Sequence, residues 1–146
     1  MKKKLVILVV AFLFTKLLVA QSNTLHRDSI LSLIDYSFKN IGLDKLDIAV
    51  KGLNTSLEYG KLHNDKEIIK SSATGLGAAY ISLQNLDQAD KYYTIALEVN
   101  PTSITSSDYN NIANLFELKK DIPSAVKYYK LSRQLCVEKK DSFKII

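Results

Sequence analysis

Small and aromatic residues recur along this chain at one fixed spacing. Three pairs share an offset of 36 residues, namely Ala89 and Ala125, Tyr80 and Phe116, and Tyr93 and Tyr129. One offset shared by small and aromatic positions indicates a structural repeat, and periods of roughly 20 to 50 residues fold as stacked supersecondary units. The repeat therefore predicts an architecture in which each unit packs against its neighbours in the chain.

The best-defined unit lies between Leu76 and Pro101. Its repeat positions are Leu76, Gly77, Tyr80, Ala89, Tyr93, Ala96 and Pro101. This set resembles the tetratricopeptide repeat, which has Leu-Gly-x-x-Tyr on a first helix, then Ala, an aromatic residue, Ala and Pro on a second. The small residues let two antiparallel helices approach closely, and the proline ends the second helix because it cannot continue the hydrogen-bond ladder. The resemblance implies an all-α fold, a right-handed α-solenoid of about three antiparallel helix pairs.

Two further copies flank this unit. The downstream copy spans Tyr109–Val137 and is carried by Tyr109, Ile112, Ala113, Phe116, Ala125 and Tyr129. The upstream copy rests mainly on Ala49, which precedes Ala89 by 40 residues. We expect repeats at about 25–62, 65–101 and 106–139. The stretch Ala49–Ser72 also resembles the longer repeats in exported regions of bacterial sensor and regulator proteins.

Capping patterns and apolar spacings of three and four residues predict six helices. The expected ranges are 25–40, 44–62, 65–84, 87–99, 106–119 and 122–139. Each of four expected helix starts has a polar residue three positions before an acid: Asp44 and Asp47, Asn64 and Glu67, Asp87 and Asp90, Thr105 and Asp108. Asp121, two residues before Pro123, is expected to cap the last helix. The hydroxyl-rich segment Ser103–Asp108 is expected to form a mobile surface loop.

The first 20 residues have the composition of an export signal. Three lysines at positions 2–4 precede an apolar run, Leu5–Phe14, and the small pair Val19-Ala20 precedes Gln21. We therefore predict a signal peptide at 1–20 and a repeat domain at 21–146, exported to the periplasm or secreted. The alternative is a membrane anchor formed by residues 5–19, although a spanning helix needs about 20 apolar residues.

The export signal also accounts for the basic charge of the chain. Four of the 20 lysines and arginines lie in residues 1–20 and none of the 15 acids do, which leaves 16 cations against 15 acids. A protein that binds nucleic acid normally presents a clustered basic surface. The sequence therefore predicts no nucleic-acid partner, and membrane contact only if the signal is not cleaved.

The sequence offers no constellation of catalytic or metal-binding residues. The two histidines, His26 and His63, fall on different expected helices, and neither neighbours a nucleophile or a set of metal ligands. The glycines of Gly75-Leu76-Gly77 lie inside an expected helix and so do not form a phosphate loop. The single cysteine, Cys136, is expected to be packed or half-buried; the alternative is a thiol that reacts or pairs with another chain. We predict no enzyme activity, no catalytic residues, no cofactor and no metal.

In an array of this family the first helix of each pair normally lines the binding face. Counting from Gly77 and Ala113, the candidate peptide-binding residues are Ser71, Thr74, Ala78, Ile81, Ser82, Asn110, Asn114 and Glu117. Asn110 and Asn114 are one turn apart and share a face. Their amides could hold an extended peptide, because each offers a donor and an acceptor. The alternative is that they are solvated polar residues. The surface lacks the basic side chains with which the family's best-known members bind a terminal carboxylate.

The repeat, the export signal and the missing catalytic groups together predict a non-catalytic scaffold or adaptor that binds a protein or peptide. The alternative is a truncated or detached input region of a histidine kinase or transcriptional regulator with such repeats. The terminal apolar residues Phe143, Ile145 and Ile146 also suggest self-association through the C-terminal helix.

Overall fold

The computed structural model describes residues 26–142, with side chains described up to residue 138. The predicted export signal lies outside these residues. The described chain is helical throughout and contains no strand. Its elements are a first helix at 26–42, α2 (Leu46–His63), α3 (Lys66–Ser82), α4 (Leu86–Val99), a short 3-10 turn η1 (Pro101–Ser103), α5 (Ser106–Leu118) and α6 (Ile122–Ser142). The six predicted helices and the all-α class are confirmed.

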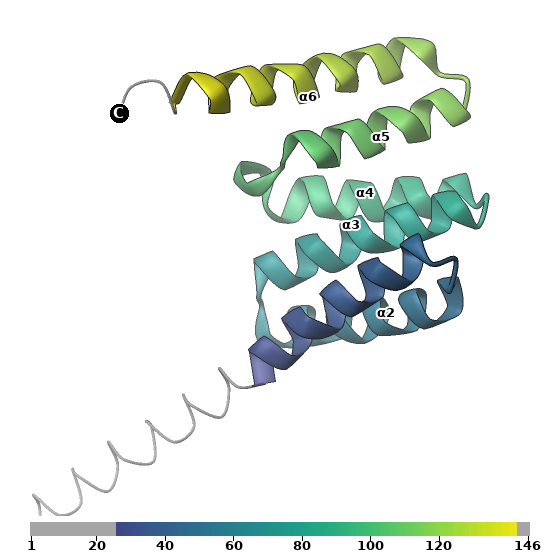
Figure 1. Cartoon of the computed structure of the whole chain (residues 1–146), viewed down its shortest axis with the longest axis vertical. Coiled ribbons are helices and arrows are strands. Elements are labelled where there is room, and N and C mark those ends of the chain that lie inside the picture. Colours follow the sequence, from purple (N-terminus) through teal and green to yellow (C-terminus); the bar gives the residue numbers. More distant parts are fainter. Residues whose placement is uncertain (1–25, 143–146) are drawn as a thin grey trace, which may run out of the picture.

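The helices stack in chain order, as Figure 1 shows, with the first helix and α2 at one end and α6 at the other. Successive helices pack on one another: α2 against α3, α3 against α4, α4 against α5 and α5 against α6. Short connections force neighbouring helices to run antiparallel. The chain therefore forms an α-solenoid of three helix pairs, 26–63, 66–99 and 106–142.

Four of the five connections between the described helices share one geometry; the exception is the α4–α5 connection through η1. Each of the four has a residue in the left-handed conformation, at Asp44, Asn64, Gln84 and Lys120, with φ between 51° and 63°. The next N–H then donates to the carbonyl five residues back, at 2.9 Å in all four turns. This arrangement satisfies carbonyls at the end of the preceding helix, as a Schellman-type C-cap does.

The turns within the three helix pairs recur at the same offsets as the sequence pattern. They lie at Asp44, Gln84 and Lys120, so that their offsets are 40 and 36 residues. Five residues after each comes an alanine with little or no exposure: Ala49, Ala89 and Ala125, at 0%, 0% and 3%. The same turn and the same small residue therefore recur in all three pairs, including the first pair, where the sequence pattern is weakest.

Three of the predicted N-caps are wrong by one or more residues. Asp65, not Asn64, caps α3 by accepting from the N–H groups of Glu67 and Ile68, and Asn85, not Asp87, caps α4. Helix α2 begins after Lys45, and no side chain caps it. The reason is that Asp44 and Asn64 adopt the left-handed conformation that ends the preceding helix, which moves each start one residue later.

The other two predicted caps are confirmed. Thr105 and Asp108 form a reciprocal capping box at the start of α5. Asp121 accepts from the N–H of Ser124 at 3.2 Å, in the first turn of α6.

The segment before α5 is not the surface loop that its hydroxyl content predicts. The η1 turn is followed by Ile104, which is only 8% exposed, and Thr105 already belongs to the capping box. A buried apolar side chain next to the capped start of α5 anchors the connection. None of the described helices is long and apolar enough to cross a membrane.

The core consists of two clusters, one on each side of α3. The first joins the first helix, α2 and α3 through Ile34, Leu53, Leu57, Ile68 and Leu76. The second joins α4 and α5 through Ala89, Tyr93, Ile112 and Leu115, with Ile81 of α3 packed against it. Helix α3 thus links the two clusters.

Candidate peptide-binding site

The α3 half of the predicted binding face is more buried than the sequence suggests. Thr74 is 6% exposed, and Ile81 packs against the second core cluster. Ser71 and Ala78 are half-buried, while Ser82 is exposed and bonds back to the carbonyl of Ala78 at 3.4 Å. The surface that α3 offers a partner is therefore made of small side chains.

The α5 half of the face is polar and open to solvent. Asn110 and Asn114 are both exposed, and neither amide makes a hydrogen bond to another described side chain or backbone group. Glu117 is also exposed, but its carboxylate accepts a 2.8 Å hydrogen bond from the hydroxyl of Tyr129 on α6. Helices α3 and α5 contact each other, so the small residues and the two amides belong to adjoining helices.

A buried ion pair fixes α5 against α3 next to this face. Lys70 Nζ lies 2.6 Å from Asp108 Oδ2, and the two side chains are only 12% and 8% exposed. The same carboxylate accepts hydrogen bonds from the N–H and the hydroxyl of Thr105, each at 2.8 Å. A buried ion pair is tolerated when further hydrogen bonds satisfy its remaining lone pairs. The pair therefore fixes the relative position of the two helices that line the face.

Three hydroxyl groups lie buried on the inner side of this region. The side-chain oxygens of Ser72, Thr74 and Tyr93 are inaccessible and have no hydrogen-bond partner among the described residues. Burial, with a smaller contribution from the charge of Asp108, raises the pKa of Tyr93 well above its usual value. Tyr93 is thus a neutral packing residue whose ring lies over Gly77, where an added Cβ would come within 2.7 Å of Cζ.

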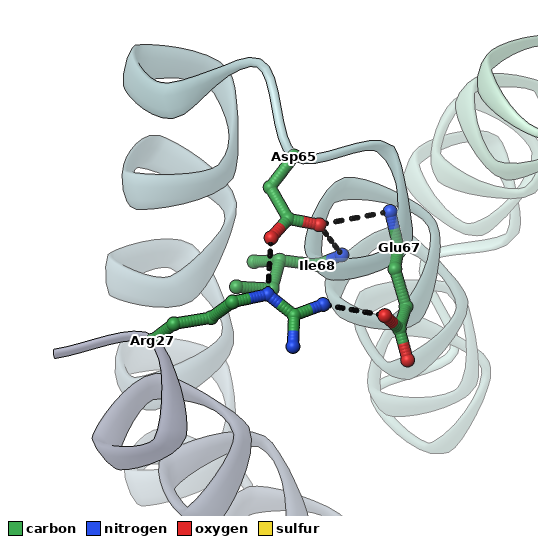
Figure 2. A network of polar contacts seen from close by, with 4 residues as sticks. All are labelled: Arg27, Asp65, Glu67 and Ile68. Atoms are coloured by element: carbon green, nitrogen blue, oxygen red, sulfur yellow. Dashed lines mark hydrogen bonds and ion pairs between the residues drawn. The ribbon is translucent and has the colours of Figure 1, made fainter. Parts of the chain in front are cut away.

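An ion-pair network fixes the first helix to the start of α3. Figure 2 shows Arg27 reaching across to Asp65 and Glu67; its Nε donates to Asp65 Oδ2 at 2.6 Å. Burial alone raises the pKa of Asp65, but hydrogen bonds from Arg27 and from the N–H groups of Ile68 and Glu67 lower it below its usual value. One carboxylate therefore both caps α3 and holds the first helix against it.

The structure also shows two hollows that the sequence did not reveal. One, of about 350 Å³, lies between the first helix and α2 and is lined by Leu33, Tyr36, Ile48, Lys51, Gly52 and Thr55. The other lies at the α3–α4 turn and is lined by Leu83, Gln84, Asn85, Leu86, Asp87 and Lys119. Neither contains a residue of the predicted face.

The two histidines lie closer together than the sequence indicated. His26 and His63 come from different helices, as predicted, but both contact the ring of Tyr59, with centroids 5.6 Å and 4.2 Å away. Among the described residues, no group of three or more metal-ligating side chains comes together.

The prediction for Cys136 is wrong. Its side chain is exposed on α6. The helical period places it beside the outward-facing residues of α6, which no neighbouring helix covers.

Comparison with known proteins identifies the repeat. The family described as Tetratricopeptide repeat matches residues 71–103, which run from α3 to the η1 turn. The chain also resembles the crystal structure of the TPR domain of Arabidopsis FLU, with a TM-score of 0.67 and 19% sequence identity. That similarity covers 74% of this chain and 94% of the other. No curated protein sequence matches the chain.

These findings agree with the geometry. The matched segment coincides with the helix pair that carries the sequence motif, and the shared turns and alanines extend the same unit to the pairs on either side. The chain therefore contains a tetratricopeptide repeat and has the fold of a tetratricopeptide-repeat domain.

Proposed function

We propose that this chain is a non-catalytic scaffold that binds an extended peptide or a protein segment across α3 and α5. The observation that carries the proposal is the pair of exposed amides, Asn110 and Asn114, one turn apart beside the small side chains of α3. An asparagine amide can donate to a peptide carbonyl and accept from a peptide N–H at once. Two of them on one face match the alternating groups of an extended backbone.

The surroundings of the amides favour a ligand without a strong negative charge. The predicted face carries one charged side chain, Glu117, and no lysine or arginine. The nearby cation Lys70 is already paired with Asp108 and is largely buried. A peptide bound here is held by backbone hydrogen bonds and by contact with small side chains rather than by a terminal carboxylate.

The test is a selection from a random 12-residue peptide library displayed on phage, followed by fluorescence anisotropy with the selected peptides. Asn110→Ala combined with Asn114→Ala should weaken binding about tenfold or more, because each lost hydrogen bond contributes roughly 1 kcal/mol. Gln134→Ala is the matched control, because it removes an exposed amide from α6. Equal affinities for the double variant and the control would disprove the role of the amides.

We also propose that the protein is exported and that residues 1–20 are removed. The lysines at positions 2–4, the apolar run and the small residues before Gln21 support this proposal. N-terminal sequencing of the protein recovered from the envelope or medium should give a chain that begins near Gln21. Recovery of the intact N-terminus in the membrane fraction would instead support the anchored alternative.

A further inference from the structure

The outer side of α6 carries an exposed apolar stripe. It consists of Ile122, Val126, Tyr129 and Val137, with exposures of 54%, 44%, 38% and 50%. Their spacings of four, three and eight residues place all four on one face of the helix. No described element covers this face, since α6 lies at the end of the stack (Figure 1).

The centre of this face is covered in the other two pairs, at the position of Tyr129. Tyr129 is equivalent to Tyr93 in the second pair, 36 residues earlier, and Tyr93 is equivalent to Leu53 in the first pair, a further 40 residues earlier. Those two residues are 2% and 0% exposed, because the next pair packs on them. The stripe on α6 is thus the surface on which this architecture normally places another layer.

The opposite end of the stack is built differently. On the first helix, the positions equivalent to Ile68 and Ala79, which are buried at 0%, are occupied by Asp28 and Lys39, and both are exposed. These charges solvate the first pair, as a terminal capping repeat does. Head-to-tail stacking of copies would bury Lys39 against an apolar stripe that already contains the cation Arg133, so this end fits α6 less well than a surface without a lysine.

The cation Arg133 within the stripe indicates what kind of surface could cover α6. Arg133 lies among the apolar residues of α6, at the position equivalent to Leu57, which is 3% exposed in the first pair. A cation there needs an acid on the covering surface. The end of the stack itself presents one, because Glu117 is exposed and held beside Tyr129 by their 2.8 Å hydrogen bond.

We propose that α6 pairs antiparallel with α6 of a second copy of this chain, about a two-fold axis that crosses the stripe at the level of residues 131 and 132. This register sets Arg133 of each copy opposite Tyr129 and Glu117 of the other, where it forms an ion pair and a cation–π contact. It also sets Val126 opposite Val137, and these two residues lie about three helical turns apart on the same side of the stripe. One register therefore pairs both the apolar residues and the opposite charges, as an isologous interface requires.

The first test is the mass of the purified protein, measured by size-exclusion chromatography with light scattering over a range of concentrations. The unmodified chain should be a dimer at high concentration, and Val126→Glu should shift it to a monomer with unchanged helical circular dichroism. Leu62→Glu is the matched control, because it places the same charge on an exposed leucine of α2, 82% accessible, and should leave the dimer intact. A wild-type chain that stays monomeric, or a Val126→Glu variant that stays dimeric, would overturn the proposal.

The second test addresses the register. Arg133→Glu should weaken the dimer about tenfold or more, and Arg133→Glu combined with Glu117→Arg should restore it, because the swapped charges meet again across the axis. In a Cys136→Ser background, Val126→Cys combined with Val137→Cys should give an intermolecular disulfide between positions 126 and 137 on mild oxidation. A dimer that neither regains affinity in the charge swap nor forms this crosslink would disprove the antiparallel pairing.

Discussion

The first helix pair and the two later pairs achieve the same fold with different packing. In the second pair the rings of Tyr80 and Tyr92 stack with centroids 5.5 Å apart and planes 5° from parallel. In the third pair Phe116 and Tyr128 stack at 5.4 Å and 5°. The two stacks occupy equivalent positions of the repeat, because Phe116 and Tyr128 each follow Tyr80 and Tyr92 by 36 residues.

The first pair has no aromatic residue at either of these positions. Its equivalents are Asn40, whose amide donates to the carbonyl of Tyr36 at 2.8 Å, and Gly52. An added Cβ at Gly52 would come within 2.2 Å of Ser37 Oγ, so the two helices are in close contact there. The turn and the buried alanine are thus constant in all three pairs, whereas the aromatic stack can be replaced by a close helix contact.

The first prediction, with the largest expected effect, tests whether the first helix pair has space for the aromatic stack. Asn40→Tyr combined with Gly52→Tyr should destabilise the protein by about 3 kcal/mol or more, because the helices lack the space that the rings need. Urea denaturation followed by circular dichroism measures the change. The single variant Gly52→Tyr should account for most of the loss.

Thr55→Tyr is the matched control for this experiment. Thr55 is exposed on the same helix, so a tyrosine there should change stability by less than about 0.5 kcal/mol. If the double variant were as stable as this control, the helix spacing of the first pair would have to be adaptable, and the distinction between the two packing modes would fail.

A second prediction concerns the connection between the first pair and the rest of the stack. Asp65→Ala removes both the N-cap of α3 and the partner of Arg27, and it should cost about 2 kcal/mol, most of it from the cap. Arg27→Ala removes the ion pair alone and should cost less, because Arg27 is about one-third exposed. Thermal unfolding of both variants at neutral pH measures the difference.

The Asp65 carboxylate also predicts how the stability of the protein depends on pH. Because the pKa of Asp65 is lower in the folded protein than its usual value, its stabilising effect is complete above the unfolded value of about 3.9 and is lost as the pH falls through the folded value. The stability gap between wild type and Asp65→Asn should therefore shrink between about pH 4 and the acid limit. A gap that stays constant over this range would contradict the role of the carboxylate charge.

A third prediction sharpens the equivalence of the two aromatic stacks. Double-mutant cycles on Tyr80 with Tyr92 and on Phe116 with Tyr128, all to alanine, should each give a coupling of about 1 kcal/mol. The two couplings should agree within about 0.5 kcal/mol, because the ring geometries are nearly identical. A coupling near zero in one pair only would show that the stacks are not equivalent.

The sequence predicted the helices and the repeat well because these depend on local patterns. Small residues, apolar spacing and Pro101 marked the second pair, and the structure extends that unit in both directions. The sequence predicted the N-caps poorly. Asp44 and Asn64 are residue types that often cap helices, but in the structure they are left-handed turn residues. Only the hydrogen bonds of the whole turn distinguish these two roles.

The candidate site shows a similar limit. The sequence placed Thr74 and Ile81 on the open face by counting along α3, but it could not show that Thr74 is buried or that Ile81 packs against residues of α4 and α5. Asn110 and Asn114 remain exposed because α5 belongs to the last pair. Helical periodicity gives the direction of a side chain, whereas its burial depends on elements that come later in the chain.

The smallest predicted effect compares two tyrosines at equivalent positions of the second and third pairs. Tyr93 is buried and its hydroxyl has no partner among the described residues, while the hydroxyl of Tyr129 is bonded to Glu117 near the surface. Tyr93→Phe should therefore stabilise the protein by up to about 1 kcal/mol, because it removes an unsatisfied polar group, whereas Tyr129→Phe should cost about 0.5 kcal/mol. Urea titrations at one protein concentration measure both changes. If the two changes in the free energy of unfolding have opposite signs, the contribution of a tyrosine at this position depends on whether another helix pair covers it. A loss of stability in both variants would instead indicate that a water molecule satisfies the hydroxyl of Tyr93.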